Sequence, residues 1–242
     1  MPMNRADFDR FADEYHALHA QNIGVTGETP DYFAHYKIKD VFNQTRTTLR
    51  SSENLKILDF GCGVGSSIPF WRRYFPVSDL VCVDVSARSL DIAYDRFKNS
   101  ANYVLFEGGN LPLKSGVFDI AFSACVFHHI SSTEHVPLLR EILRVLSKNS
   151  GALYLYEHNP LNPLTLRAVN SCPFDADAVL IPPHRMRRQF RNAGFSGICL
   201  GYRVFFPRAL KHLRFLEPRL GFLPLGAQYC ITGRHQTPVE NA

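Results

Sequence analysis

The sequence has few of the features that mark membrane-spanning, secreted or metal-binding chains. No uninterrupted apolar run approaches the roughly 20 residues that a spanning helix requires, and the first residues contain no apolar stretch typical of a signal peptide. The six cysteines stand singly without a CxxC pair, which favours reduced thiols over disulfides or a zinc site. No His, Asp and Glu residues have metal-site spacing, so we predict no metal. We expect a cytoplasmic protein with no membrane span.

The chain also lacks a strong excess of charge of one sign. Its 242 residues carry a formal net charge of +5, with 45% hydrophobic and 20% charged residues, as is typical of a globular chain. In the densest basic stretch, "RMRRQFR", helical spacing places Arg187 and Arg191 on one face and Met186 and Phe190 on another. This pattern favours a solvated surface helix over a nucleic-acid patch. Nucleic acid is therefore not the expected partner.

Short apolar segments alternate with segments of helical length along most of the chain. Two helices are predicted before this alternation starts, at residues 5–21 and 31–49, the second capped by Asp31 after Pro30. The predicted strands are residues 56–60, 79–85, 102–108, 118–127, 151–158, 196–206 and 226–235. The predicted helices between them are residues 68–75, 86–100, 133–149 and 184–195.

Strands that are apolar throughout and alternate with helices indicate a parallel sheet buried on both faces. We therefore predict an α/β fold with a doubly wound, mostly parallel, seven-stranded sheet that binds its ligand at the carboxyl ends of the strands. The length favours one domain. Its expected parts are an N-terminal helical cap at 1–50, a cofactor-binding core at 55–158, and a substrate-side and C-terminal part at 159–242 with a lid insertion near 207–225.

The most informative motif is "KILDFGCGVGSS" at residues 56–67. Gly61, Gly63 and Gly65 follow the first predicted strand, where glycine permits positive φ and close approach of the backbone to a ligand. Asp84 ends the second predicted strand 19 residues beyond Gly65, where nucleotide-binding sheets carry an acid that accepts both ribose hydroxyl protons. The G-x-G-x-G spacing, with Asp59 before it, differs from the G-x-G-x-x-G of dinucleotide sites. It favours a ligand with an amine or a positive charge over a pyrophosphate.

Together "DFGCGVG" and "VCVDVS" resemble the nucleoside-binding motifs of the class I, Rossmann-like S-adenosylmethionine-dependent methyltransferases. The stretch "FEGGNLPLKSGVFDIAFSACVFHHI" is similar to a block of the ubiquinone-methyltransferase-like branch of that family. The resemblance runs from about residue 56 to about residue 151, and it implies a methyltransferase fold with S-adenosylmethionine as the cofactor. More loosely, "FDRFADEYHA" resembles the N-terminal helix that closes over the cofactor, with Tyr15 as a contact.

The resemblance also implies which residues bind the cofactor. Glu107 occupies the position of the acid that meets the adenine amino group, where the family more often has Asp, and Leu111 is expected beside the adenine. Ala124 and Cys125, at the end of the fourth predicted strand, are expected to line the methionine end. The complete predicted cofactor-binding set is Tyr15, Tyr36, Asp59, Gly61, Cys62, Gly63, Gly65, Asp84, Val85, Glu107, Gly108, Leu111, Ala124 and Cys125.

Tyr36 and Lys37 lie in the second predicted helix and carry groups that suit a carboxylate. Tyr36 is a candidate contact of the methionine carboxylate, with a role as a core aromatic equally open. For Lys37 a solvated helix face is the favoured interpretation.

Three histidines follow the predicted strands at the cofactor end of the sheet. Methyl transfer needs a nucleophile held in line, and a base where that nucleophile carries a proton. His158, at the end of the fifth strand, is the preferred base, and Glu157 beside it either orients its imidazole or is a surface acid. In the tandem His128 and His129, His129 is the second catalytic candidate, with a role in bracing the loop slightly favoured.

The predicted function is methyl transfer from S-adenosylmethionine to a small-molecule acceptor, most often a hydroxyl oxygen, in secondary or cell-envelope metabolism. Transfer to nitrogen, carbon or RNA remains an alternative, as does a methyltransferase-like domain that binds the cofactor without turnover. A nicotinamide oxidoreductase is disfavoured by the glycine spacing and by Asp59. The Leu- and Phe-rich residues 207–225 could form a lid, a substrate wall or a dimer surface. A lid is preferred, and a homodimer is left open.

Overall fold

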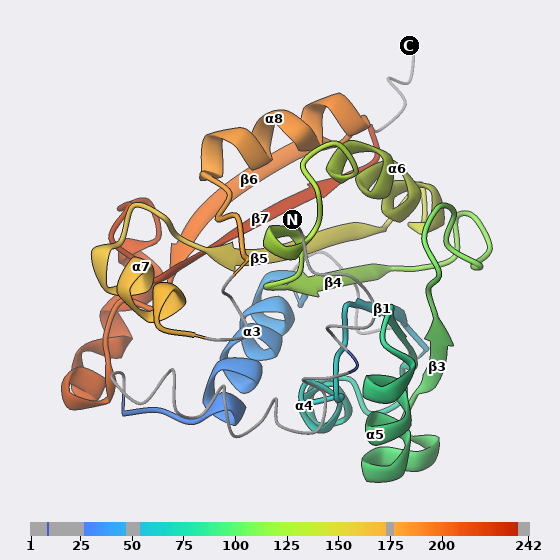
Figure 1. Ribbon diagram of the computed structural model, residues 1–242, viewed down its shortest axis with the longest axis horizontal. Helices are drawn as coiled ribbons and strands as arrows, with labels where there is room; N and C mark the ends of the chain where they lie inside the picture. Colours follow the sequence, from blue (N-terminus) through green and yellow to red (C-terminus); the bar gives the residue numbers. More distant parts are fainter. Residues whose placement is uncertain (1–8, 10–26, 47–53, 173–176, 237–242) are drawn as a thin grey trace.

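The computed structural model describes residues 9, 27–46, 54–172 and 177–236, and their central feature is a seven-stranded sheet (Figure 1). The strand order is β3-β2-β1-β4-β5-β7-β6. Only β7 runs antiparallel to its neighbours, so the sheet is mixed but mostly parallel, as predicted. The strands are β1 Lys56–Phe60, β2 Asp79–Asp84, β3 Asn102–Leu105, β4 Ile120–Ala124, β5 Ala152–His158, β6 Ser196–Arg203 and β7 Gln228–Arg234.

Helices flank the sheet on both sides (Figure 1). They are α3 Pro30–Thr45, α4 Ile68–Tyr74, α5 Ala87–Phe97, α6 His135–Val145, α7 Pro163–Asn170, α8 Pro183–Ala193 and α9 Glu217–Leu220. Short 3-10 segments are η2 Lys98–Ser100, η3 Phe127–His129 and η5 Arg208–Leu216. The predicted helix at residues 5–21, with Tyr15, lies outside the described residues apart from Asp9.

Two hydrophobic clusters fill the space between the sheet and its helices. One joins α6 and α8 to one face of the sheet, and Met186 and Phe190 of α8 are fully buried in it. Arg187 and Arg191 of the same helix are exposed, which confirms the solvated basic face. The other cluster joins α3 and α4 to the opposite face and includes the fully buried Trp71. A sheet covered on both faces explains strands that are apolar throughout.

Several local predictions are wrong, each for a physical reason. The cap of α3 is Thr29, whose hydroxyl accepts the Tyr32 N–H at 3.3 Å, while Asp31 lies in the first turn. The fourth strand ends at Ala124 rather than at residue 127, because Cys125 has a φ of +58° and starts a turn. The predicted helices did not include α7, which begins at Pro163 and is capped by Asn162.

The register of the sheet decides what lies beside its carboxyl edge. The parallel strands β1, β2, β4 and β5 all end at this edge. In the antiparallel β7, Gln228 pairs with His158 on one side and with Arg203 on the other. The β6–β7 connection, residues 204–227, therefore lies at the same edge as the predicted site.

Candidate functional site

The loop after β1 has the conformation that its glycines predict. Gly61, Gly63 and Gly65 have φ values of +75°, +53° and +77°, a region that L-residues with side chains rarely adopt. The Gly61 N–H donates to the Val83 carbonyl of β2 at 2.8 Å, which holds the loop against the end of the neighbouring strand. The turn therefore lies at the carboxyl edge of the sheet, between β1 and α4.

The three glycines serve different packing requirements. A Cβ on Gly61 would lie 2.3 Å from Cγ2 of Val126, so this position allows the β4 loop to approach closely. A Cβ on Gly65 would lie 2.9 Å from Cδ1 of Ile68 and 3.1 Å from Cβ of Ala93, at the contact between helices and sheet. Around Gly63, in contrast, none of the described residues has a heavy atom within 4 Å of the Cβ position. Gly63 thus borders open space at which a ligand could meet bare backbone.

Asp84 ends β2 and holds this loop. Its Oδ2 accepts the Gly63 N–H at 2.7 Å, and its Oδ1 accepts the Ser86 N–H at 2.9 Å. Burial raises the pKa of Asp84, although these backbone N–H groups act in the opposite direction. Ser86, rather than Asp84, caps α5 by accepting the Ser89 N–H. Its two carboxylate oxygens are acceptors of the kind that two ribose hydroxyls require.

Asp59 lies within β1, just before the loop. Its side chain is buried, and its Oδ2 accepts the indole N–H of Trp71 at 2.9 Å. Burial raises its pKa to about 7, the Trp71 hydrogen bond lowers it, and the neighbouring Asp84 raises it further. A buried acid of this kind gains stabilisation from a bound cation such as an ammonium.

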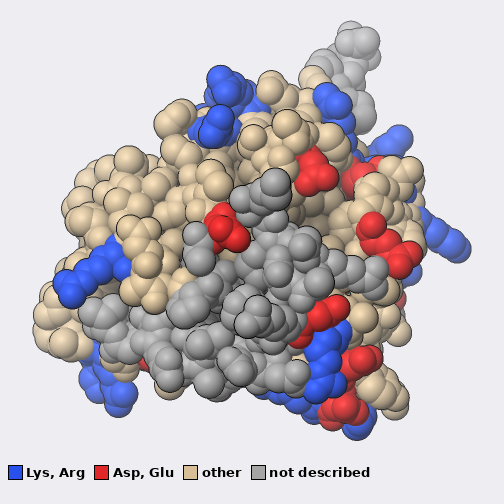
Figure 2. Space-filling view, viewed as in Figure 1, with Lys and Arg blue, Asp and Glu red and all other residues tan. Residues whose placement is uncertain are grey.

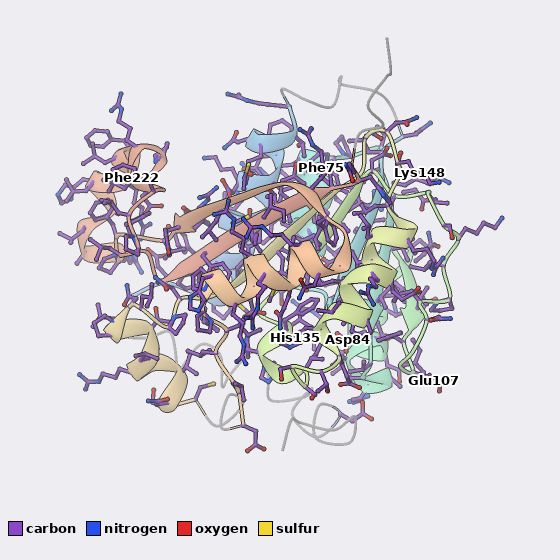
Figure 3. All side chains as sticks on the ribbon, turned by 90° about the horizontal axis from the view of Figure 1, so that it is seen from above. Phe75, Asp84, Glu107, His135, Lys148 and Phe222 are labelled. Atoms are coloured by element: carbon purple, nitrogen blue, oxygen red, sulfur yellow. The ribbon has the colours of Figure 1, made fainter. Side chains whose placement is uncertain are left out.

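The residues predicted for the adenosine side come from β2, β3 and the loops after them. Val85 is half-buried, and Glu107 and Gly108 are exposed just beyond β3. Asp84 and Glu107 lie on the same side of the molecule (Figure 3). A Cβ on Gly108, which has a φ of +95°, would meet no atom of the described ranges within 4 Å. Leu111, in contrast, is buried in the core cluster of α6 and donates its N–H to Glu141, so in this structure it is a core residue.

Three further residues predicted to bind the cofactor are Cys62, in the loop after β1, and the two residues at the end of β4. A hydrogen bond with Cys82 and, to a smaller extent, burial raise the pKa of the Cys62 thiol well above its usual range, so the thiol stays protonated. Ala124 and Cys125 follow one another at the carboxyl edge, and the amide of Gln228 donates to the Cys125 sulfur at 3.6 Å. Ala124 and Cys125 therefore lie at the edge of the sheet where the ligand is expected, and their contact with the methionine end stays a prediction.

A buried carboxylate and three imidazoles lie next to one another at the ends of β4 and β5. Oε2 of Glu157 is 2.6 Å from Nδ1 of His128, and both side chains are 1% exposed. Oε1 of Glu157 accepts the N–H groups of Val126 and Phe127 at 3.1 and 2.8 Å. Burial would raise the pKa of Glu157, but His128, His158 and the backbone donor together lower it. Glu157 is therefore ionised, and we assign the shared proton to Nδ1 of His128.

The other two histidines lie around His128. The His129 ring is centred 4.1 Å from that of His128, and the His158 ring 5.2 Å from it. His129 is buried, whereas His158 is partly exposed at the end of β5. Both proposed roles of Glu157 were wrong, because it is neither a surface acid nor hydrogen-bonded to His158. The prediction placed His128 at this edge but did not pair it with Glu157. The available signal was an acid inside an otherwise apolar strand, "ALYLYEH".

The predictions for α3 also need correction. The Tyr36 hydroxyl donates to Oε2 of Glu217 at 2.7 Å, so its partner is α9 rather than a methionine carboxylate. Burial and Glu217 raise the pKa of Tyr36, which keeps this phenol protonated. Lys37 is 8% exposed, so the solvated helix face predicted for it is wrong. In the described part of the chain, no three His, Cys, Asp or Glu side chains are grouped as metal ligands would be.

Comparison with known proteins agrees with this geometry. The family model described as "Methyltransferase domain" matches residues 58–155, the span that contains the glycine loop, Asp84 and the β4 loop. Over this span the chain is similar to the S-adenosylmethionine-dependent methyltransferases. Within the described ranges, none of the helices has the length and apolar character to cross a bilayer.

The curated relatives that this chain resembles are named for different methyl acceptors. A demethylmenaquinone methyltransferase of Thermotoga maritima is 33% identical over 107 residues, covering 44% of this chain and 45% of that protein. A thiol S-methyltransferase of Homo sapiens is 27% identical over 128 residues, covering 50% of each. The chain thus spans about half the length of the curated relatives it matches.

Solved structures support the fold over nearly the whole length. A methyltransferase of Thermotoga maritima, described as a possible histamine N-methyltransferase, has a TM-score of 0.64 at 19% identity. The alignment covers 96% of this chain and 99% of that one. At this identity the similarity concerns the fold and leaves the acceptor undetermined.

Proposed function

We propose that the protein transfers a methyl group from S-adenosylmethionine to a small-molecule acceptor. The observation that carries this proposal is the Gly63–Asp84 hydrogen bond of 2.7 Å beside a glycine whose Cβ position is open. It puts a carboxylate and bare backbone together at the carboxyl edge of the sheet, where α/β folds bind nucleosides. The match of residues 58–155 to a methyltransferase family model supports the same reading.

Four groups of this chain would hold the cofactor. Asp84 accepts the ribose hydroxyl protons, and the Gly63 backbone lies against the amino-acid part. Asp59 faces the ammonium, and Glu107 meets the adenine amino group. When bound, S-adenosylmethionine supplies a methyl group on a positively charged sulfur, from which a nucleophile can displace it.

The acceptor reacts at the side of the sheet where β4 and β5 end. His158 removes the proton of the acceptor, preferentially a hydroxyl, and is the catalytic residue. The Glu157–His128 pair fixes one imidazole among the three and so acts as a positioning element. His129, with its ring packed against His128, braces the loop. A thiol is more acidic than a hydroxyl and needs less help from a base. The contribution of His158 to the rate should therefore be larger for a hydroxyl acceptor than for a thiol.

Calorimetry with S-adenosylhomocysteine tests the cofactor site. The wild-type protein should bind it, and Asp84→Ala should weaken binding at least about tenfold, because hydrogen bonds to a charged group are lost. Asp91→Ala, an exposed acid on α5, is the matched control and should bind as the wild type does. A folded wild-type protein that binds neither S-adenosylmethionine nor S-adenosylhomocysteine would end the proposal.

A transfer assay tests the acceptor side. Labelled methyl groups are followed from S-adenosylmethionine to panels of hydroxyl, thiol and amine compounds, with hydroxyls expected to react best. His158→Ala should lower kcat and leave the Kd for S-adenosylhomocysteine unchanged. Unaltered turnover in this variant would show that His158 is not the base.

A further inference from the structure

Large apolar side chains point into solvent at one end of the molecule. The side chains of Leu161, Leu164, Phe215, Phe222 and Leu225 are 58%, 67%, 69%, 76% and 65% exposed. A single exposed leucine is ordinary in a folded protein, but a group that includes two phenylalanines marks an interaction site. We name this group the apolar end surface.

The segments that carry these side chains are joined to one another. The amide of Asn162, the cap of α7, donates to the Leu225 carbonyl at 2.7 Å, and the hydroxyl of Thr165 donates to the Ala227 carbonyl at 2.9 Å. The α7 helix and residues 208–225 lie at the same end in both ribbon views (Figures 1 and 3). In Figure 3, Phe222 lies at the outer edge of this end, away from Asp84 and Glu107.

The same segments are unusually one-sided in charge. Across residues 158–172 and 196–236 the only carboxylate side chain is that of Glu217, and it is buried. The exposed cations of these segments include Arg167, Arg208, Lys211 and Arg219. In Figure 2 the left end of the molecule is mostly tan with blue groups at its border.

The apolar end surface is held outward by contacts with α3. Glu217 accepts the Tyr36 hydroxyl at 2.7 Å, and Arg214 donates to Glu28 at 2.7 Å. The Arg214 guanidinium also lies 4.5 Å from the centre of the Tyr32 ring. These contacts use the polar side of the 208–220 segment, none of whose η5 residues is buried. The exposure of Phe215 is therefore built into the packing of this segment.

We propose that the apolar end surface docks on an anionic lipid bilayer. Phenylalanine and leucine side chains that project among lysines and arginines are the pattern of interfacial binding, in which apolar groups enter the headgroup region and cations pair with lipid phosphates. A second copy of this chain fits less well, because a symmetric contact would oppose Lys211, Arg219 and their equivalents to like charges. This surface adjoins His158 through residues 159–162, so docking would bring a lipid-borne acceptor to the reactive side.

Vesicle flotation tests the proposal without requiring turnover. The whole protein is mixed with vesicles of phosphatidylcholine alone, or with about a third of the lipid replaced by phosphatidylglycerol, and the bound fraction is measured. We expect binding to the anionic vesicles only, falling as salt rises from 0.1 to 0.5 M because exposed charges are screened at about 10 Å or less. Equal binding to both vesicle types, or to neither, would overturn it.

Paired variants separate the two contributions. Lys211→Glu with Arg219→Glu should lower the partition coefficient by roughly thirtyfold or more, and Phe215→Ser with Phe222→Ser by at least about tenfold. The matched controls are Arg187→Glu with Arg191→Glu on α8, and Val77→Ser, all at exposed positions elsewhere. Control variants that lose binding equally would refute the assignment of this surface.

Two further measurements distinguish a failure of membrane docking from a failure of the fold or of the proposed function. All variants should retain binding of S-adenosylhomocysteine, which shows that the fold and the proposed function do not depend on the apolar end surface. Sedimentation equilibrium reports the oligomeric state. A dimer that dissociates in the Phe215→Ser, Phe222→Ser variant would assign the surface to a second copy and overturn membrane docking.

Discussion

Cofactor binding should be linked to proton release from Asp59. This side chain is 2% exposed, and burial raises its pKa to about 7. If its carboxylate faces the ammonium of the cofactor, as we propose, the bound state requires the ionised form. An opposite charge nearby lowers a carboxyl pKa by about 1–3 units. Binding of S-adenosylhomocysteine, which carries the same amino-acid group, should therefore tighten as pH rises toward 7.

The size of the effect follows from the pKa. With a pKa of about 7, Asp59 is about 3% ionised at pH 5.5 and about 50% ionised at pH 7.0, a ratio of roughly 16. If the pKa of Asp59 in the complex is about 5, the gain in affinity is smaller than this ratio, because part of the bound form is still protonated at pH 5.5. We therefore expect binding about tenfold tighter at pH 7.0 than at pH 5.5. The comparison stops at pH 7 because an α-amino group itself titrates near 8.

Calorimetry in buffers of different ionisation enthalpy measures both the Kd and the protons released. Asp59→Asn should bind with little pH dependence, whereas Asp91→Asn on the exposed side of α5 should behave as the wild type. Trp71→Phe removes a hydrogen bond that lowers the pKa, so the pH dependence should move upward. A wild-type Kd that is flat between pH 5.5 and 7.0, or an Asp59→Asn variant that keeps the slope, would refute the reasoning.

The same group affects stability in the absence of ligand. The folded state holds the Asp59 proton between its unfolded pKa near 4 and its folded pKa of about 7, so the unfolding free energy should fall as pH rises through this window. A pKa raised from 3.8 to about 7 corresponds to about 4 kcal/mol at most. Urea denaturation at pH 5 and pH 8 measures this loss, which should shrink in Asp59→Asn. Asp84, whose pKa burial also raises, contributes a slope of the same sign in both proteins.

Three other perturbations have defined outcomes. Gly61→Ala should lower the unfolding free energy, measured in urea, by about 2 kcal/mol or more through overpacking and strained φ. Its Cβ would lie 2.3 Å from Cγ2 of Val126, so the additional change Val126→Ala should restore part of the loss. Glu157→Gln should lower kcat and alter the pH–rate profile, with the Kd for S-adenosylhomocysteine kept, because the amide is uncharged and its one acceptor oxygen cannot serve both His128 and the loop N–H groups; an unchanged profile would exclude the positioning role. Tyr36→Phe should leave that Kd within about twofold and cost about 1–3 kcal/mol by leaving a buried carboxylate oxygen unpaired; a large loss of affinity would reinstate Tyr36 as a cofactor contact.

Much of the fold could be predicted because its determinants are local. Short, mostly apolar strands of four to eight residues, and Ser86 placed to cap α5, follow from short stretches of sequence. The ends of elements were less predictable, since they depend on distant partners. The apolar run of β4 continues past residue 124, and only the φ of +58° at Cys125, held by a hydrogen bond to the Tyr156 carbonyl of β5, ends the strand.

The residues of the site also differ in how far they could be predicted from local sequence. The cofactor side is encoded in one loop and one strand end, so Gly63 and Asp84 could be predicted together from their spacing. Tyr36 could not, because its partner Glu217 is 181 residues away along the chain. Lys37 looked like a solvated residue on α3, yet the packing of that helix against the sheet leaves it 8% exposed.

Glu157 explains why the acceptor side depends on tertiary structure. One oxygen of this carboxylate accepts the N–H groups of Val126 and Phe127 and thereby shapes the loop after β4, while the other fixes the ring of His128. The loop that borders Gly61 and the histidine group are consequently linked through one side chain of β5. A change of acceptor that required this loop to move would also move the imidazoles. We therefore expect a new acceptor to be accommodated more easily through α7 and the β6–β7 connection, which lie outside residues 58–155, the span that matches the family model.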